Sequence, residues 1–300
     1  MKIIDIKTPN DIVINEDIAV AIGGFDGIHL GHQALLNKLS NSSYKKAVLT
    51  FNPTPKSFFS NLEIKYLTPL MDKLTFFKDF DYVLIINFNN SFKNMSKDEF
   101  IKLLNINHVK EVICGFDFTF GKNKEGKALD LSTFKLSIIS KLEINNEKIS
   151  SSNIRRYLDN GNILKANQFL GRFYKIKGKV IDGSHLGRTI GFPTANIEQN
   201  DYYLPKNGVY VTLTSYKNRI YRSMTNIGNN PTFNYQNNKR IETYLLDLDM
   251  NLYNEEITIY FIDKIRDEIK FNSKNELILE LTKNKEYVRN YNYENTNLLL

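Results

Sequence analysis

A glycine-rich turn between an apolar segment and a helical pattern constrains the fold of the first half of this chain. Residues 18–22 read Ile-Ala-Val-Ala-Ile, which predicts a buried strand. Residues 24–32 read Gly-Phe-Asp-Gly-Ile-His-Leu-Gly-His, and leucines at helical spacing follow in residues 33–39. Such a turn presents backbone N–H groups and the positive end of a helix dipole, which suit a phosphate. It is not a Walker A loop, because no Gly-Lys-Ser/Thr follows, and it lacks the G-x-G-x-x-G spacing of dinucleotide-binding folds.

Two of the 4 histidines of the chain, His29 and His32, stand in this turn. Their spacing places them on one face of the first helical turn. The alternative is a pair of surface histidines with no function. Gly31 argues against that alternative, because a glycine lets a ligand lie close to the backbone. The two histidines are therefore candidates for binding or catalysis.

The composition limits the class of protein. A length of 300 residues predicts about two domains. The single cysteine, Cys114, excludes an internal disulfide and a multi-cysteine metal site. No apolar run reaches the roughly 18 residues of a membrane span, and no signal peptide is recognisable, so we expect a cytoplasmic protein that binds no membrane. The net charge of +7 suits anionic substrates such as ATP, but no basic and aromatic pattern indicates a nucleic-acid groove.

Strand and helix patterns alternate through the first half. Residues 46–51, 82–86 and 111–114 read as further strands. A capping box, a serine with a glutamate three residues later, opens a helix over residues 96–104. This alternation predicts an α/β domain with a parallel sheet, which binds ligands at the carboxyl ends of its strands.

Three segments near those ends carry unusual residues. Residues 51–55 read Phe-Asn-Pro-Thr-Pro and residues 115–121 read Gly-Phe-Asp-Phe-Thr-Phe-Gly. Residues 149–155 read Ile-Ser-Ser-Ser-Asn-Ile-Arg and end in the first arginine of the chain. Each segment also has a purely structural interpretation: a rigid turn backed by aromatic residues, phenylalanines of the core, and serines that cap a helix.

The periodicity changes after a helix over residues 163–170 and a glycine that ends it. Five later segments read as strands with turn signals between them, namely residues 177–181, 208–213, 222–227, 243–246 and 257–262. This pattern predicts an antiparallel barrel. A helical pattern returns only over residues 275–281, and we assign no function to the tail, residues 284–300.

Residues 183–196 hold the chemistry of the second half. They read Gly-Ser-His-Leu-Gly-Arg-Thr-Ile-Gly-Phe-Pro-Thr-Ala-Asn, so three spaced glycines precede two oxygen-bearing side chains. A glycine loop can approach phosphates, and the oxygens of Thr194 and Asn196 are hard donors that suit Mg²⁺. The alternative is a glycine-proline turn between two strands.

These motifs resemble, in order, those of the bacterial bifunctional riboflavin kinase/FMN adenylyltransferase (FAD synthetase) family, from about residue 19 to residue 271. The H-x-G-H turn is similar to the phosphate-binding motif of the nucleotidylyltransferase superfamily. Gly-Phe-Pro-Thr-Ala-Asn resembles the riboflavin kinase signature, and residues 226–233, Asn-Ile-Gly-Asn-Asn-Pro-Thr-Phe, match another family motif.

The resemblance implies two domains. Residues 1–172, including a linker helix, would form a Rossmann-like nucleotidylyltransferase domain with a parallel sheet. Residues 173–300 would form an antiparallel β-barrel riboflavin kinase domain. The second would phosphorylate riboflavin with ATP to give FMN, and the first would adenylylate FMN with ATP to give FAD and pyrophosphate. A homo-oligomer is compatible with the sequence.

The resemblance also implies roles for particular residues. The catalytic residues would be Glu242, His29, His32 and Arg155. The ATP- or phosphate-binding residues would be Gly24, Asp26, Gly31, Ser150, Ser151, Gly183, Gly187 and Gly191. The flavin-binding residues would be Pro53, Pro55, Phe58, Asp117, Phe118, Phe120 and Arg266. The Mg²⁺ ligands would be Thr194 and Asn196.

The sequence departs from the family pattern in the loop at residues 51–55. Asn52 and Thr54 replace an aspartate and a histidine, whereas Ser152 replaces a threonine and keeps the hydroxyl. The changes at Asn52 and Thr54 favour one rival interpretation, a riboflavin kinase with an inactive adenylyltransferase half. Two further rivals are a flavin-binding module without turnover and an enzyme that adenylylates another phosphate ester. A solvated strand glutamate and a surface ion pair remain the alternatives for Glu242 and Arg266.

Overall fold

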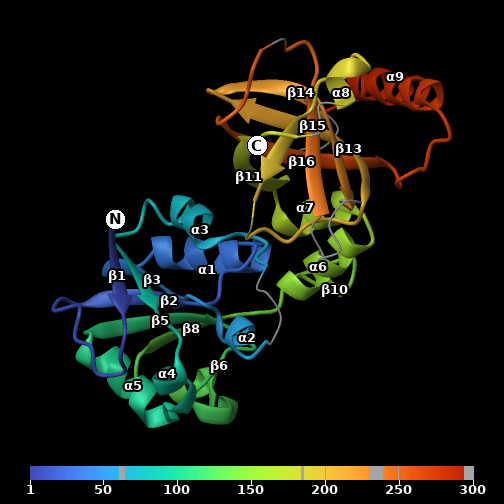
Figure 1. Cartoon of the computed structure of the whole chain (residues 1–300). Helices are drawn as coiled ribbons and strands as arrows, with labels where there is room; N and C mark the ends of the chain where they lie inside the picture. Colours follow the sequence, from blue (N-terminus) through green and yellow to red (C-terminus); the bar gives the residue numbers. More distant parts are fainter. Residues whose placement is uncertain (61–64, 184–185, 200, 230–238, 249, 294–300) are drawn as a thin grey trace. The chain divides into compact units, whose positions relative to one another are not determined.

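The computed structural model describes residues 1–300 except 61–64, 184–185, 200, 230–238, 249 and 294–300. The contacts between residues divide the chain into two compact units, Met1–Ser151 and Ser152–Leu300. Figure 1 shows a sheet with helices in the first unit and a barrel in the second. The predicted fold class, a parallel α/β domain followed by an antiparallel barrel, is confirmed.

A six-stranded parallel sheet forms the first unit. Its strands, in spatial order, are β1 (Lys2–Ile6), β4 (Tyr82–Ile86), β3 (Lys45–Phe51), β2 (Ile18–Ile22), β5 (Val109–Gly115) and β8 (Lys135–Ile139). The chain runs outward from β2 through β3 to β4 and then crosses back to β5 on the other side of β2. The strand order therefore reverses beside β2, and such a reversal opens a crevice outside the carboxyl ends of the strands. The edge strands β1 and β8 were not predicted.

Strand β2 is buried on both faces, as its unbroken apolar run predicts. Ile18, Val20 and Ile22 belong to one core cluster, whereas Ala19 and Ala21 belong to the other. The alanine face packs against α1 (Leu30–Ser40) and α3 (Leu70–Phe76), and the other face packs against α4 (Asn90–Asn94) and α5 (Lys97–Ile106), as Figure 1 shows. The predicted capping box is present at the start of α5.

Short elements form the loops of this unit. They are α2 (Pro55–Phe58), β6 (Thr119–Phe120), η1 (Lys122–Lys124), β7 (Gly126–Lys127), η2 (Ala128–Leu131), β9 (Glu143–Ile144) and β10 (Glu147–Lys148).

Two helices follow, α6 (Ser151–Asp159) and α7 (Ile163–Leu170), and α7 has the predicted bounds. It ends at Gly171, whose left-handed backbone (φ 69°) favours glycine. The contacts divide the chain in the first turn of α6 and so group both helices with the barrel, whereas the sequence places the boundary near residue 172. The limits of the two activities stay a prediction, because a compact unit and an active module need not end at the same residue.

A closed barrel of six antiparallel strands forms the second unit. In spatial order they are β11 (Tyr174–Ile181), β12 (Ala195–Glu198), β15 (Lys239–Leu245), β14 (Arg219–Asn229), β13 (Gly208–Tyr216) and β16 (Glu256–Arg266). The sequence missed β12, which begins inside the glycine-rich signature, and the short α8 (Leu186–Thr189) before it.

The final helix, α9 (Lys274–Asn290), is longer than predicted, and this corrects our interpretation of the tail. Val288, inside the segment to which we assigned no role, is fully buried with Val211 and Met224. The polar residues around it concealed the helix, because only one face of α9 packs on the barrel. Residues 294–300 lie outside the described part.

Candidate active sites

The turn between β2 and α1 has an unusual backbone. Phe25 (φ 48°) and Ile28 (φ 38°) adopt left-handed conformations that non-glycine residues rarely occupy, and Gly27 (φ 89°) lies between them. Both non-glycine side chains are fully buried in the core below the turn. Burial thus holds the backbone in a strained shape, as often happens at functional sites.

The two histidines lie together at the start of α1. His29 is the N-cap of the helix, and its Nδ1 accepts a hydrogen bond of 3.3 Å from the backbone N–H of His32. The two imidazole rings stack with their centroids 3.7 Å apart. A Cβ atom on Gly31 would lie only 3.2 Å from the His29 ring, so the glycine leaves room for this ring. The structure therefore brings both predicted catalytic histidines to the positive end of a helix dipole.

Asp26 ties this turn to two distant segments. Its carboxylate accepts hydrogen bonds from the backbone N–H groups of Leu67 (2.9 Å) and Thr68 (3.2 Å). Its backbone carbonyl accepts a hydrogen bond of 2.7 Å from the hydroxyl of Ser151. Two predicted phosphate-binding residues, Asp26 and Ser151, are thus in contact, and Ser150 precedes Ser151 directly. These hydrogen bonds give Asp26 a role in holding the turn.

Lys73 on α3, which the sequence analysis did not select, contacts the same turn. Its side chain is 2% exposed, and Nζ donates a hydrogen bond of 3.0 Å to the carbonyl of Gly24. The ammonium group also lies over the ring of Tyr66, 5.5 Å from the centroid. Nothing in the local sequence marks this lysine, because lysines are common on helices and are seldom buried.

The loop after β3 is held by local contacts that involve several of the predicted flavin-binding residues. Thr54 is the N-cap of α2, its Oγ1 accepting a hydrogen bond of 3.2 Å from the backbone N–H of Ser57. Pro55, a predicted flavin contact after Pro53, occupies the first position of the helix, which suits proline. The ring of Phe58 packs edge-on against Phe88 at 5.3 Å.

The loop after β5 combines a charged tip with a packed base. Asp117 is exposed and forms a 2.5 Å ion pair with Lys148. Phe120 instead belongs to the core cluster, where its ring centroid lies 4.9 Å from that of Phe100, and the partly buried Phe118 packs against the same cluster. The structure therefore gives these two predicted flavin contacts a packing role, which the alternation of phenylalanines also indicated.

Arg155 belongs to α6 and lies in the same compact unit as the barrel. Its guanidinium lies over the ring of Tyr203, 5.3 Å from the centroid, and the Tyr203 hydroxyl donates a 2.7 Å hydrogen bond to Asp159. Burial raises the pKa of Tyr203 to about 12, so this hydroxyl keeps its proton at neutral pH. Ser151 and Arg155 are four residues apart in one helix and therefore share a face.

A second cluster of predicted site residues lies on the barrel. Glu242 on β15 pairs directly with Asn196 on β12 and with Asn226 on β14. The next residue, Thr243, is fully buried and bonded at 2.9 Å to the hydroxyl of Thr225. Since neighbouring residues of a strand face opposite ways, Glu242 points away from the side that Thr243 occupies. The three polar residues thus share one face.

The glycine loop closes on this cluster. A Cβ atom on Gly183 would fall 2.0 Å from Nδ2 of Asn196, and one on Gly187 would lie 3.2 Å from the Thr194 hydroxyl. Gly191 has a left-handed backbone, with φ 82°. Within the described residues, Oδ1 of Asn196 is buried and accepts no hydrogen bond. An orphaned amide oxygen beside a threonine hydroxyl and a close glycine backbone is a donor set that fits Mg²⁺ and phosphate.

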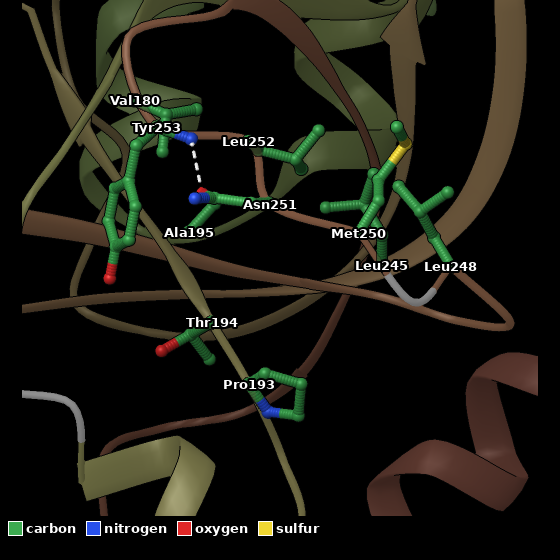
Figure 2. A pocket seen from close by; sticks show the side chains of 10 residues that line it. All are labelled: Val180, Pro193, Thr194, Ala195, Leu245, Leu248, Met250, Asn251, Leu252 and Tyr253. Carbon is green, nitrogen blue, oxygen red and sulfur yellow. Dashed lines mark hydrogen bonds between the residues drawn. The ribbon is translucent and has the colours of Figure 1, made fainter.

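A cavity of about 310 Å³ adjoins Thr194, and the sequence analysis did not predict it. It is lined by Val180, Pro193, Thr194, Ala195, Leu245, Leu248, Met250, Asn251, Leu252 and Tyr253. Figure 2 shows Leu245, Leu248 and Met250 on one side of the view, and Thr194 and the Tyr253 ring on the other. Three separate segments form it, at residue 180, residues 193–195 and residues within 245–253, so no local motif marks it.

Arg266, a predicted flavin contact, lies at the end of β16. Its Nε lies 3.1 Å from Oε1 of Glu280 on α9, and its guanidinium lies over the ring of Phe271. Burial lowers the pKa of Arg266, and the nearby Glu280 carboxylate opposes that shift. The ion pair fastens α9 to the barrel.

The motif at residues 226–233 is described only through residue 229, since residues 230–233 lie outside the described part.

Comparisons with known proteins match both halves. A family model described as FAD synthetase matches residues 11–153, and one described as riboflavin kinase matches residues 170–292. The chain is 40% identical to the bifunctional riboflavin kinase/FMN adenylyltransferase of Listeria monocytogenes, over 90% of this chain and 91% of that protein. It is 36% identical to the protein of that name from Bacillus subtilis, over 97% and 98% of the two chains.

A solved structure from Streptococcus pneumoniae has the same fold, with a TM-score of 0.89, 31% identity, and coverage of 97% of this chain and 100% of that chain. It is titled a macrolide-efflux protein. Among the described residues of the present chain, no helix is long and apolar enough to cross a membrane.

Proposed function

This chain belongs to the bifunctional riboflavin kinase/FMN adenylyltransferase family, and we propose which of its residues carry the two reactions. The enzyme converts riboflavin to FMN and FMN to FAD, with ATP as the co-substrate. We assign the phosphorylation of riboflavin to the barrel and the adenylylation of FMN to the sheet unit. The observation that supports the first assignment best is the pairing of Glu242 with Asn196 beneath the glycine loop.

In the kinase reaction, Glu242 would accept the proton of the ribityl hydroxyl. The hydroxyl oxygen then bonds to the γ-phosphorus of ATP while the bond to the leaving ADP oxygen breaks. Phosphoryl transfer depends mainly on positioning and on neutralising charge. Thr194 and Asn196 would hold Mg²⁺, which neutralises charge on the phosphates when bound. The glycines at 183, 187 and 191 would let the backbone approach those phosphates.

The cavity beside Thr194 would take the adenosine of ATP. Its apolar side chains, among them Leu245, Leu248, Met250 and Leu252, suit a flat aromatic base. Because Thr194 lies at its edge, a base bound there would leave the phosphates beside the proposed Mg²⁺ ligands. Arg266 and Phe271, on the side of α9, are candidates for the flavin.

In the adenylyltransferase reaction, a phosphate oxygen of FMN would attack the α-phosphorus of ATP and displace pyrophosphate. No protein nucleophile is required. His29 and His32 would stabilise charge on the triphosphate as preorganised donors, together with the N–H groups at the start of α1. Ser150, Ser151 and Arg155 stay candidates for the same triphosphate on the resemblance of their motif.

The test replaces Glu242 with glutamine, which keeps size and hydrogen bonding but cannot accept the proton. Loss of a general base typically lowers the rate by ~10²–10⁴-fold. Glu242→Gln should therefore fail to phosphorylate riboflavin and still convert supplied FMN to FAD, as resolved by chromatography with Mg-ATP. Glu198→Gln, an exposed glutamate on β12, is the matched control and should keep both activities. A Glu242→Gln protein with an unchanged kinase rate would contradict the assignment.

A further inference from the structure

We propose that Arg240 is a positioning residue for Glu242, and this inference rests on the proposed role of Glu242 as the base. Arg240 and Glu242 are two residues apart on β15 and therefore face the same side of the strand. The Nη1 atom of Arg240 lies 3.0 Å from Oε1 of Glu242, which makes a charge-assisted hydrogen bond. The sequence analysis did not select Arg240.

The neighbouring strands leave this contact in place. The residues paired with Glu242 across the sheet are Asn196 and Asn226, which are both uncharged. The residue paired with Arg240 on β14 is Gly228, and Oε1 of Glu268 lies 2.2 Å from where a Cβ atom on that glycine would stand, so a second carboxylate lies near this part of the strand pair. The side chains of Arg240 and Glu242 are 34% and 23% exposed, so the pair is only partly screened by water.

In this geometry the two oxygens of the Glu242 carboxylate have different roles. Arg240 holds Oε1, which leaves Oε2 to accept the proton of the substrate hydroxyl. An arginine suits this task because its guanidinium stays protonated in proteins and therefore does not compete for the substrate proton. A misplaced base loses much of its effect, since an error of about 1 Å can lower a rate ~10²-fold.

The experiment is a double-mutant cycle on the full-length enzyme. Arg240→Met and Arg240→Lys are made in the wild type and in Glu242→Gln, and kcat and KM for riboflavin and Mg-ATP are measured. Arg240→Met alone should lower the kinase kcat by roughly 10–100-fold, with both KM values within about twofold. Arg240→Lys keeps the charge but not the planar fork and should recover part of the loss.

The Glu242→Gln background separates positioning from other roles. If Arg240 acts through Glu242, adding Arg240→Met there should change kcat by less than about twofold. Equal losses in both backgrounds, or a raised KM for Mg-ATP at unchanged kcat, would overturn the proposal; the second result would make Arg240 a phosphate ligand. Arg219→Met, an exposed arginine of β14, should behave as wild type.

An unchanged circular-dichroism spectrum and thermal unfolding transition in each variant show that the barrel has folded, and retained FMN adenylylation shows the same for the sheet unit. An unchanged kcat in Glu242→Gln alone would contradict the proposed role of Glu242 as the base. That result can be told apart from a failure of the Arg240 proposal, because it is seen in a variant that leaves Arg240 unchanged.

Discussion

Gly183 and Asn196 lie so close that a Cβ atom on the glycine would fall 2.5 Å from Cγ of the asparagine. Asn196 cannot move away easily, because β12 holds it between Ile181 of β11 and Glu242 of β15. The absence of a side chain at position 183 therefore lets the glycine loop close on the proposed Mg²⁺ ligand.

We predict that Gly183→Ala disables the kinase and spares the adenylyltransferase. The added methyl group must displace either the Asn196 amide or the loop, and misplacing a ligand by about 1 Å can cost ~10²-fold in rate. The measurement is FMN formation from riboflavin, with FAD formation from FMN in the same sample as the control. Normal kinase activity in a folded Gly183→Ala protein would show that the loop does not position Asn196 for the reaction.

Alanine substitutions of the two histidines should lower FAD synthesis alike, but only the substitution of His29 should lower the stability of the protein. His32→Ala should lower FAD formation from FMN by ~10²–10³-fold, as loss of one preorganised donor does. His29→Ala should lower it similarly and also reduce the free energy of unfolding by ~1 kcal/mol, because His29 caps α1. His29→Asn keeps a capping side chain and should lose activity without that loss of stability. Unchanged FAD synthesis in folded His32→Ala would contradict the assignment of this site.

Thr54 tests the departure from the family pattern. Its hydroxyl caps α2, so Thr54→His should lower stability by ~1 kcal/mol and change the KM for FMN modestly, whereas Thr54→Ser should keep both. We expect the turnover number for FAD to stay the same in both variants. If the wild type makes no FAD and Thr54→His does, the rival interpretation of an inactive adenylyltransferase half is correct.

Burial of Cys114 should make the free energy of unfolding depend on pH, and burial also determines the sign of that dependence. The thiol is fully buried on β5, and burial raises its pKa from 9.0 to about 11. The unfolded chain therefore releases this proton first, so the stabilising effect is complete below about pH 9 and is lost as the pH rises toward 11.

Between those values the free energy of unfolding should fall more steeply in the wild type than in Cys114→Ala, by at most ~1.4 kcal/mol per pH unit. Denaturant titrations at several pH values measure this difference, and titrating tyrosines cancel in the comparison. Identical slopes for both proteins would contradict it. Iodoacetamide should label Cys114 at neutral pH only after unfolding.

The features that consecutive residues encode could be predicted from the sequence alone. The apolar run of β2 predicted a strand buried on both faces, and Gly171 marked the end of α7, because one residue type suits each of those local conformations. The glycine turns and the capping box of α5 were equally readable. The alternation of strands and helices also predicted that the loops after β3 and β5 lie at the carboxyl ends of parallel strands.

Which distant residues meet became visible only in the folded chain. Strand β12 has four residues and no periodic pattern, and it forms because β15 pairs with it from more than 40 residues away along the chain. The same pairing sets Glu242 beside Asn196, and the packing of α3 brings Lys73 to Gly24. Such contacts depend on the register between strands and on helix packing, since a shift of one residue would turn every side chain to the other face. No single stretch of sequence contains that information.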